Sequence, residues 1–444
     1  MGKNIHEIRD PIHVFVRLDS HERAVLDSRP FQRLRQIHQL ALTYLVYPGA
    51  THRRFEHSLG VMELASRLYD VITHPDNLTD QIKADLPEVS RDDDRSYWRR
   101  VIRMAALCHD IGHLPFSHAA EKELLPKGWD HERITREIIL SDEMKTIWGK
   151  ITPPFRPEDI VKLAIGPKKA KDLDFSPLET ILAEIIVGDA FGIDRMDYLL
   201  RDSHHIGVAY GKFDHYRLID TMRILHPAPS DQKETSNEPA LGVEEGGIQS
   251  AEALMLARYF MYSQVYFHAI RRIYDIHLKD FLKGWLKDDT FSTDINEYLA
   301  MTDNEVITEL LKAANDTDNP YHNLACRIVC HEHFKELYRR NPNDVNINPE
   351  AGQAIYKAAQ KEFGPDKFRH DRYTQKSGAP EFPVKTNDDK IVSSLAISTT
   401  LCNLPVISID YVFADRDILE KAFNWLEKNR YNIIQLKEEE EDNE

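Results

Sequence analysis

The sequence predicts a mostly α-helical protein with a small α+β part near its C-terminal end. Three observations support this prediction. Apolar residues recur at helical spacing over several long segments, strand-type residues gather only after residue 391, and 42% of the residues are hydrophobic. The chain has 444 residues, which is ample for a sizeable core and allows one large domain or about two to three smaller ones.

The predicted helices carry apolar residues every three or four positions, the spacing of a buried helical face. They span residues 56–72, 97–111, 178–202 and 248–286. Gly188 and Gly192 lie inside the third segment, where we expect them to loosen the helix, because an interior glycine costs about 1 kcal/mol relative to alanine.

Turn-rich and strand-rich segments interrupt this helical pattern. Residues 226–247 are turn-rich and are expected to carry a short β-ribbon that ends at its paired glycines. Residues 341–350 and 376–390 resemble loops in composition. Residues 392–412 are rich in Ile, Val, Ser, Thr and Tyr, which favours strands, and a helix is expected over 415–428.

This pattern predicts a chain in four parts. They are a helical core over residues 1–290, a helical extension over 291–375, a small α+β region over 376–436 and an acidic disordered tail over 437–444.

The charge balance argues against a general nucleic-acid binder, because 57 basic residues oppose 73 acidic ones and the net charge is −16. No apolar run approaches the roughly 18–20 residues that a membrane span needs. The N-terminal residues lack the apolar core of a secretory signal, and four cysteines are too few for a disulfide framework. We therefore expect a cytoplasmic protein with no membrane partner.

Histidine and aspartate residues concentrate between residues 52 and 205, on or beside the apolar helices. The set consists of His57, His109, Asp110, His113, His118, His131 and Asp194. Neutral imidazole and carboxylate hold divalent metal ions, and a bound ion lowers the pKa of its water towards neutrality. Burying so many ionisable groups is costly unless a metal or a substrate pairs them.

Ordinary explanations compete with this interpretation elsewhere in the chain. His370-Asp371 lies among charged residues without partner histidines and is interpreted as surface. Cys326 and Cys330, followed by His331 and His333, are interpreted as buried thiols on a helix rather than a second metal site, because no second pair lies at zinc-finger spacing. The lysines of the sequence GPKKAKD are expected to form a solvated loop.

Three runs together, HRRFEH at 52–57, CHDIGHLPFSH at 108–118 and GIDRMDYLLRD at 192–202, resemble the HD-domain phosphohydrolases in order and spacing. More closely, the chain resembles their deoxynucleoside triphosphate triphosphohydrolase branch, which includes bacterial enzymes and the animal SAM- and HD-domain dNTPase. DPIH at 10–13 and FQRLRQIHQL at 31–40 extend the likeness, which covers roughly residues 5–290. It implies an HD-domain helical core of the bacterial type.

The resemblance implies a role for each matching residue. The metal ligands would be His57, His109, Asp110 and Asp194, with Asp189 as the alternative for the last. The catalytic residues would be His113, His118, His131 and Glu121. The substrate contacts would be Gln39, Arg54, Arg195, Tyr198, Asp202 and Tyr274. An intersubunit guanine-nucleotide site (GTP or dGTP) would use Asp27, Gln32 and Arg35, although these residues also suit an ordinary charged helix surface.

These assignments imply hydrolysis of dNTPs to deoxynucleoside and inorganic triphosphate by a homo-oligomer, with a tetramer favoured. The cofactor would be one divalent ion, Mn, Fe, Co, Zn or Mg, with additional Mg accompanying the substrate phosphates. Two alternatives stay open: an HD phosphohydrolase for a modified nucleotide or a monophosphate, and a nucleotide-sensing protein with vestigial catalysis. The sequence also departs from the animal form, which has a phosphate-binding Arg in the helix before Arg271-Arg272 where this chain reads Tyr266-Phe267-His268.

Overall fold

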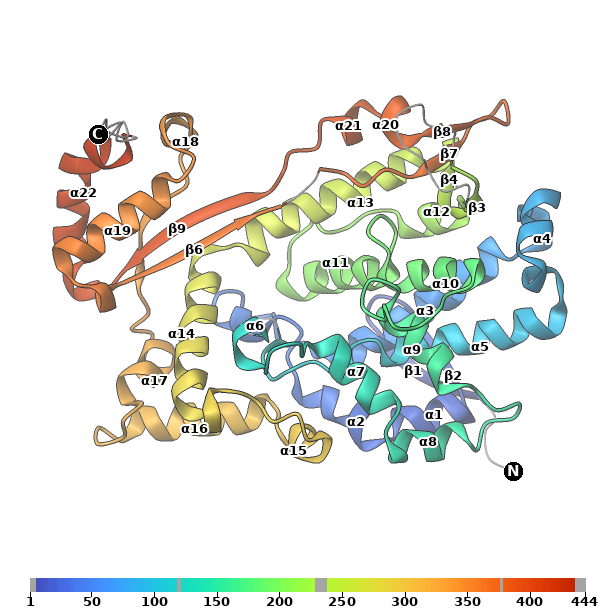
Figure 1. The fold of residues 1–444 in the computed structure, drawn as a ribbon, viewed down its shortest axis with the longest axis horizontal. Coiled ribbons are helices and arrows are strands. Elements are labelled where there is room, and N and C mark those ends of the chain that lie inside the picture. Colours follow the sequence, from blue (N-terminus) through green and yellow to red (C-terminus); the bar gives the residue numbers. More distant parts are fainter. Residues whose placement is uncertain (1–4, 118–120, 228–237, 376–377, 436–444) are drawn as a thin grey trace, which may run out of the picture. The chain divides into compact units, whose positions relative to one another are not determined.

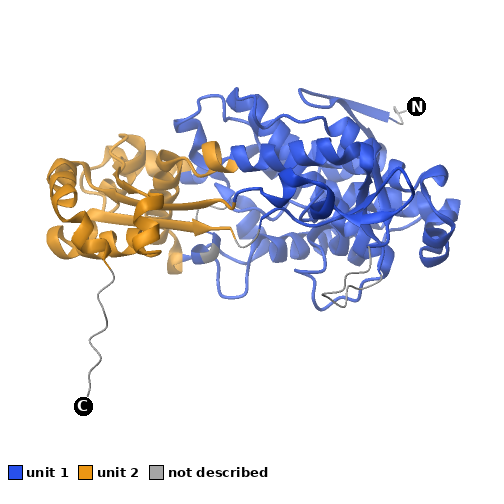
Figure 2. Ribbon diagram, turned by 90° about the horizontal axis from the view of Figure 1, so that it is seen from above, with its two compact units in different colours: residues 1–261, 290–306, 377–405 blue, residues 262–289, 307–376, 406–444 orange. Residues whose placement is uncertain are grey.

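The computed structural model describes residues 5–117, 121–227, 238–375 and 378–435, which form two compact units (Figure 2). The first unit comprises residues 1–261, 290–306 and 377–405, and the second comprises 262–289, 307–376 and 406–444. Both units are mostly helical with small sheets, which confirms the predicted mostly α fold class.

The first unit contains most of the helices. They are α1 (Ser20–Leu26), α2 (Arg29–Arg33), α3 (Arg54–Ile72), α4 (Asp80–Asp85), α5 (Asp92–Cys108), α6 (Glu121–Leu124), α7 (His131–Ile139), α8 (Asp142–Trp148), α9 (Pro157–Ile165), α10 (Pro177–Val187), α11 (Ile193–Ile206), α12 (His215–Asp220), α13 (Ile248–Met261), α15 (Ile295–Ala300), α20 (Ser394–Ile397) and α21 (Thr399–Cys402). Helices α3, α5, α9, α10 and α11 pack on one another and bury the core of this unit (Figure 1).

Two small sheets complete the first unit. β1 (Ile5–Asp10) and β2 (Val14–Asp19) form an antiparallel pair. A four-stranded sheet has the order β3 (Met222–Leu225), β4 (Ala240–Glu244), β7 (Pro383–Lys385) and β8 (Ile391–Ser393), with β4 and β7 parallel.

The second unit wraps helices around a three-stranded antiparallel sheet in the order β5 (Lys335–Arg339), β9 (Ser408–Ala414) and β6 (Phe368–Thr374). Its helices are α14 (Ala269–Trp285), α17 (His322–Val329), α18 (Pro342–Ile347), α19 (Ala351–Phe363) and α22 (Leu419–Ile434). Helix α16 (Asp303–Asn315) begins in the first unit and continues into the second.

The helical spacing located the long helices well but ran two of them across interruptions. Residues 178–202 divide into α10 and α11 at Gly188 and Gly192, the glycines expected to loosen this segment, where the backbone is non-helical with ψ angles of 143° and 123°. A Cβ at Gly188 would lie 2.3 Å from the Glu184 carbonyl oxygen and one at Gly192 would lie 2.6 Å from the Gly188 carbonyl oxygen, so a side chain does not fit at either position. Residues 248–286 divide into α13 and α14 around a π-helical turn, Tyr262–Tyr266.

Other local predictions were wrong. The expected loop at 341–350 contains α18, and the expected loop at 376–390 contains β7. The expected strands over 392–412 include two short helices before β9 begins. Of the expected ribbon over 226–247, β4 pairs with β3, which precedes that segment; residues 228–237 and the acidic tail lie outside the described residues.

No helix in the described part of the chain is both long and apolar enough to cross a membrane.

Candidate metal centre

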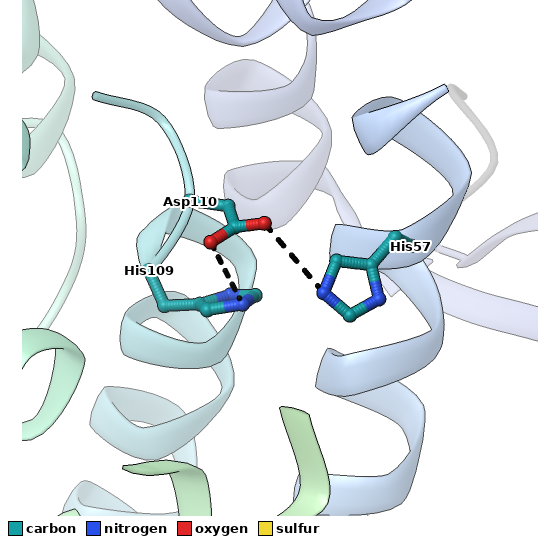
Figure 3. A group of neighbouring side chains, drawn as sticks. All are labelled: His57, His109 and Asp110. Atoms are coloured by element: carbon teal, nitrogen blue, oxygen red, sulfur yellow. Dashed lines mark ion pairs between the residues drawn. The ribbon is translucent and has the colours of Figure 1, made fainter. Parts of the chain in front are cut away.

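Two neighbouring helices bring the first three predicted ligands together. Helix α3 carries His57 on its buried face, while His109 and Asp110 follow directly after the last residue of α5 (Figure 3). Each of these side chains offers a ligand atom, and the three atoms lie within 4.8 Å of one another. All three residues are buried, so their donors meet in the protein interior rather than at its surface.

Asp194, in the first turn of α11, supplies a fourth donor. Its Oδ1 lies 3.0 Å from His57 Nε2 and 3.5 Å from His109 Nε2. The alternative carboxylate, Asp189, is instead paired with Lys168, and its side chain is 66% exposed. The structure therefore brings Asp194, and not Asp189, to the two imidazoles.

Hydrogen bonds orient both imidazole rings for metal binding. His109 Nδ1 lies 2.8 Å from the Ala106 carbonyl oxygen, and a carbonyl can only accept, so Nδ1 carries the proton. His57 Nδ1 lies 2.8 Å from Asp197 Oδ2 and likewise donates to it. Nε2 of each ring is thereby directed at the carboxylates, as in metal sites whose ligand tautomer is fixed by a partner on the far side.

The electrostatics of this cluster reflect a concentration of carboxylates. Burial alone would raise the pKa of Asp110, but the charges of His109 and Arg54 hold it well below its usual value. Burial lowers the pKa of His57, yet hydrogen bonds to Asp194 and Asp197 raise it to about 10. Ionised carboxylates therefore hold a proton on a buried imidazole, which a divalent cation would replace.

The donor set fits a divalent metal ion. Two imidazoles and two carboxylates suit Mn, Fe, Co, Zn and Mg to different degrees, so the residues do not fix the metal's identity. His109 Nε2 is buried and makes no hydrogen bond among the described residues. An inward-facing lone pair of this kind is what a metal ligand requires.

A second pair of histidines lies beside the centre. The His113 ring stacks on the His131 ring with centroids 4.1 Å apart, and His113 Nε2 lies 3.1 Å from Asp110 Oδ1. His131 Nδ1 lies 2.7 Å from Glu121 Oε1 and 3.3 Å from Glu132 Oε2. The structure thus joins predicted catalytic residues to the metal cluster, whereas His118 lies outside the described residues.

These two rings differ in their affinity for protons. Burial lowers the pKa of His113, and the positive charge of Arg54 lowers it further, well below the usual histidine value. Burial also acts against a charged His131, but Glu121 more than offsets it and the pKa of His131 is raised. The pKa values of these two stacked rings beside Asp110 are therefore shifted in opposite directions.

Two arginines flank the cluster. Arg54 Nη1 donates to Asp110 Oδ2, and its Nε donates to Ser117 Oγ at 2.8 Å. Arg195 follows Asp194 and donates to the carbonyl oxygens of Gly188 and Asp189, at 2.9 and 2.5 Å. These guanidinium groups offer positive charge beside the predicted ligands.

A cavity of about 540 Å³ opens at this centre. His109, Asp110 and Asp194 lie in its wall, together with Arg195 and the apolar side chains of Phe191 and Phe382. Lys168 and Lys169, interpreted from sequence as part of a solvated loop, also line it. Lys168 pairs with Asp189, 21 residues away, and Lys169 with Asp130, 39 residues away, and composition alone does not reveal such contacts.

The remaining predicted substrate residues have varied surroundings. Gln39 is buried, and its Oε1 has no hydrogen-bond partner among the described residues. Asp202 is also buried, with Oδ1 at 2.7 Å from His52 Nε2, while Tyr198 is half-buried on the same helix. Tyr274 belongs to the second unit, where its hydroxyl lies 2.9 Å from His331 Nδ1.

The predicted activator residues form contacts with one another and with nearby groups. Asp27 Oδ2 accepts a hydrogen bond from Arg23 at 2.7 Å, and Gln32 Nε2 donates to the Leu26 carbonyl at 2.7 Å. Arg35 donates to Gln32 Oε1 at 2.9 Å and lies 3.5 Å from the centroid of the Phe55 ring.

Sequence reasoning missed the residues behind His57. Asp197 and Arg201 lie four apart on α11, which is the spacing of an ion pair on one helix face, and that signal was available. His13, in the DPIH string, also reaches Asp197, but a contact across 184 residues leaves no local trace in the sequence.

The fold and the buried His–Asp centre define a helical metal protein, and comparisons with known proteins agree. The profile of the HD domain matches residues 54–165, and the profile of the HD associated region matches residues 213–360. A crystal structure of a hypothetical protein from Aquifex aeolicus is 32% identical and has a TM-score of 0.76, covering 95% of this chain and all of that one.

Similar sequences come from all three domains of life. A protein of Methanocaldococcus jannaschii is 34% identical over 81% of this chain and 68% of its own length. YwfO of Bacillus subtilis is 36% identical over 62% of this chain and 54% of its own length. The deoxynucleoside triphosphate triphosphohydrolase SAMHD1 of Mus musculus is 26% identical over 97% of this chain and 65% of its own length.

The chain belongs to the HD-domain family of metal-dependent phosphohydrolases. It spans about half to two thirds of the length of these three curated relatives.

Proposed function

We propose that this protein hydrolyses deoxynucleoside triphosphates to deoxynucleosides and inorganic triphosphate. The observation that carries the proposal is the pair His113 and His131, whose rings stack 4.1 Å apart, with His113 against Asp110 of the His–Asp cluster and His131 against Glu121. The similarity to SAMHD1, whose name states this activity, supports the substrate class. His57, His109, Asp110 and Asp194 are the proposed ligands of one divalent ion.

A divalent ion bound at these ligands supplies a Lewis acid for the substrate's phosphate and acidifies bound water. Water adds to the α-phosphorus, the bond from that phosphorus to the 5′ oxygen breaks, and the triphosphate leaves with the water's oxygen. The departing 5′ oxygen needs a proton. His131, whose pKa is raised by Glu121, would supply it directly or together with His118.

The arginines beside the cluster bind the triphosphate in this proposal. A triphosphate carries about four negative charges at neutral pH, and guanidinium groups match phosphate oxygens with paired donors. Arg54 and Arg195 are the candidates, because Arg54 donates to the proposed ligand Asp110 and Arg195 lines the same cavity as the ligands. The excess of acidic residues over the whole chain then does not prevent anion binding, since the positive charge is local.

The sugar contacts are proposed for Gln39, Tyr198, Asp202 and Tyr274. A site that hydrogen-bonds a substrate hydroxyl, or leaves no room for an extra one, discriminates between sugars more strongly than apolar contact does. Asp202 is the strongest candidate in the first unit, because His52 already orders its carboxylate.

Activation by GTP or dGTP at Asp27, Gln32 and Arg35, in a homotetramer, is part of the proposal. A carboxylate can accept from the ring N–H groups of guanine, and Asp27 is exposed on the surface of the first unit. The family resemblance of Asp27, Gln32 and Arg35 in the sequence motivates this part.

The proposal is tested by incubating the purified protein with each dNTP and Mn²⁺ or Mg²⁺, with and without GTP, and separating the products by chromatography. Deoxynucleoside plus intact triphosphate, absent with Asp110→Ala, is the expected result. Release of diphosphate or monophosphate would place the protein in another branch of the family. No turnover of any dNTP would contradict the proposal and direct attention to modified nucleotides and nucleotide sensing.

A further inference from the structure

The proposed ligand His57 has a carboxylate on its far side that is not itself a ligand. Asp197 lies one turn after Asp194 on α11 and is fully buried. Its Oδ2 accepts the Nδ1 proton of His57 at 2.8 Å, while Nε2 of the same ring faces the metal cluster. Asp194 and Asp197 therefore contact opposite edges of one imidazole.

Asp197 is itself held from two other directions. Arg201 donates to both of its oxygens, from Nε to Oδ2 at 2.8 Å and from Nη2 to Oδ1 at 3.0 Å. His13 Nε2 lies 2.7 Å from Oδ1. The side chains of His13, Asp197 and Arg201 are all completely buried, so water does not compete for these bonds. The carboxylate has no freedom to turn away from His57.

The N-terminal DPIH segment closes this network. Asp10 Oδ1 accepts hydrogen bonds from the backbone N–H groups of Ile12 and His13, both at 2.8 Å. Asp10 Oδ2 accepts from Arg201 Nη1 at 2.8 Å. The turn between β1 and β2 is thus tied to α11 through Arg201, and it presents His13 to Asp197.

Helix α3 leaves room for this arrangement at one position. Gly60 lies one turn after His57, and a Cβ there would lie 2.0 Å from Asp197 Oδ1 and 2.4 Å from Arg201 Nη2. Any larger residue would displace the Asp197–Arg201 pair from the helix that carries the ligand. The close approach is therefore specific to the network behind His57.

We infer that Asp197 is a positioning residue for the metal ligand His57, and that Arg201 and the Asp10–His13 turn hold it in place. It fixes the ring's tautomer and orientation and makes Nε2 a better donor, because a carboxylate partner increases imidazole basicity. The inference rests on the proposed function only in requiring a metal ion at this centre.

The test measures metal affinity separately from folding. Mn²⁺ is titrated calorimetrically into metal-stripped wild type, Asp197→Asn and Asp344→Asn, and circular dichroism follows the thermal unfolding of each metal-free form. Asp344 is the matched control, a buried carboxylate paired with Arg430 in the second unit. A carboxylate that only stabilises the fold would lower the unfolding temperature in both variants and leave the Mn²⁺ dissociation constant unchanged.

The expected result is a rise of about 10- to 100-fold in the Mn²⁺ dissociation constant for Asp197→Asn and none for Asp344→Asn. A folded Asp197→Asn protein that binds Mn²⁺ within about twofold of wild type would overturn the inference. Because no nucleotide is involved, neither result depends on the proposed substrate.

A second pair of variants decides the question if Asp197→Asn does not fold. His13→Ala removes one donor to Asp197, and His13→Gln retains a side-chain N–H of similar reach. Weaker Mn²⁺ binding in His13→Ala, restored in His13→Gln, supports the positioning role. Equal binding in both variants and wild type contradicts it.

Discussion

The dipeptide His-Asp occurs at 109–110 and at 370–371, and the two copies have opposite environments. His109 and Asp110 follow the end of α5, and both side chains reach the same cluster with His57 and Asp194. His370 and Asp371 lie within the strand β6, where adjacent side chains point to opposite faces. The local backbone therefore decides whether the pair can act on one ion.

Both residues of the second copy, His370 and Asp371, have hydrogen-bond partners within the second unit. His370 Nε2 lies 2.7 Å from Asp410 Oδ1 on the neighbouring strand. Arg272 donates to both oxygens of Asp371, at 2.6 Å each, and Asp371 is only 7% exposed. Its interpretation as surface was wrong, because the partners come from distant strands and helices that the sequence does not place.

In the first copy, a nitrogen lone pair stays available to a ligand. His109 Nε2 is buried without a hydrogen bond among the described residues, and Asp110 is surrounded by imidazoles and Arg54. Several potential ligand atoms that converge, some of them without a hydrogen-bond partner, indicate a ligand site. Side chains that satisfy one another's hydrogen-bonding groups indicate a structural ion pair.

The sharpest test of this contrast is to remove the carboxylate from each copy. Asp110→Ala should lower dNTP hydrolysis by about a thousandfold or more, because the centre loses a ligand and several kcal/mol of charge stabilisation. Asp371→Ala should leave kcat/KM unchanged but lower the free energy of unfolding by about 2–3 kcal/mol, since Arg272 stays half-buried and unpaired. Product chromatography and urea denaturation separate the two outcomes; equal losses of activity would contradict the contrast.

Removing the proton donor next to Asp110, while leaving the ligands, should have the next largest effect. His131→Asn is expected to lower kcat by about 100-fold, which is typical of losing a general acid. Metal content per chain, measured by elemental analysis, should stay at the wild-type level. A variant that loses its metal together with its activity would instead assign His131 to the metal site.

Metal binding should stabilise the unit that contains His109-Asp110, and this stabilisation should not depend on His370-Asp371. At 100 times its dissociation constant, Mn²⁺ should add about 2.7 kcal/mol to the stability of the form that binds it. The thermal midpoint should rise in wild type and His370→Gln, and should not rise in His109→Gln. A rise of equal size in His109→Gln would show that the ion binds elsewhere.

The sequence predicted the fold class, and its motifs named the four candidate ligands that lie together in the structure. His57, His109, Asp110 and Asp194 come from three separate helical segments, and the structure brings them together. The order of the motifs in the sequence indicates this grouping, because each motif lies at a helix end or on the buried face of a helix. The motifs do not reveal the hydrogen bonds that support the site. One example is the Asp303 carboxylate, which accepts from the backbone N–H groups of His38 and Phe116.

Helix periodicity had a similar limit. It located α3 and α5 to within a few residues, because α3 is buried along most of its length and α5 over its C-terminal half, Val101 to Cys108. It overran Gly188 and Gly192, where the backbone leaves the helical conformation, with ψ angles of 143° and 123°. Short elements such as α18 and β7 were missed, since their apolar residues are too few to establish a period.

The pH dependence of the reaction should depend on the acidic partners of His131. Its pKa lies above the usual histidine value, so the protonated form is complete at low pH and is lost as the pH rises through that raised pKa. Activity should fall over the same range. Glu121→Gln removes the main raising partner and should move this falling limb to lower pH, at saturating metal. An unchanged kcat–pH profile would assign the proton to another group, such as His118.

The smallest expected effect belongs to the second copy of the dipeptide. His370→Gln replaces a ring that stacks on Tyr356 at 5.3 Å and bonds Asp410 at 2.7 Å. Because an amide can still donate to Asp410, the loss should be about 1 kcal/mol in the free energy of unfolding. Mn²⁺ affinity and kcat should equal those of wild type, since neither Asp410 nor Tyr356 is a proposed ligand, catalytic residue or substrate contact. A loss of metal affinity in His370→Gln would contradict the interpretation of His370-Asp371 as a structural pair and of His109-Asp110 as the ligand site.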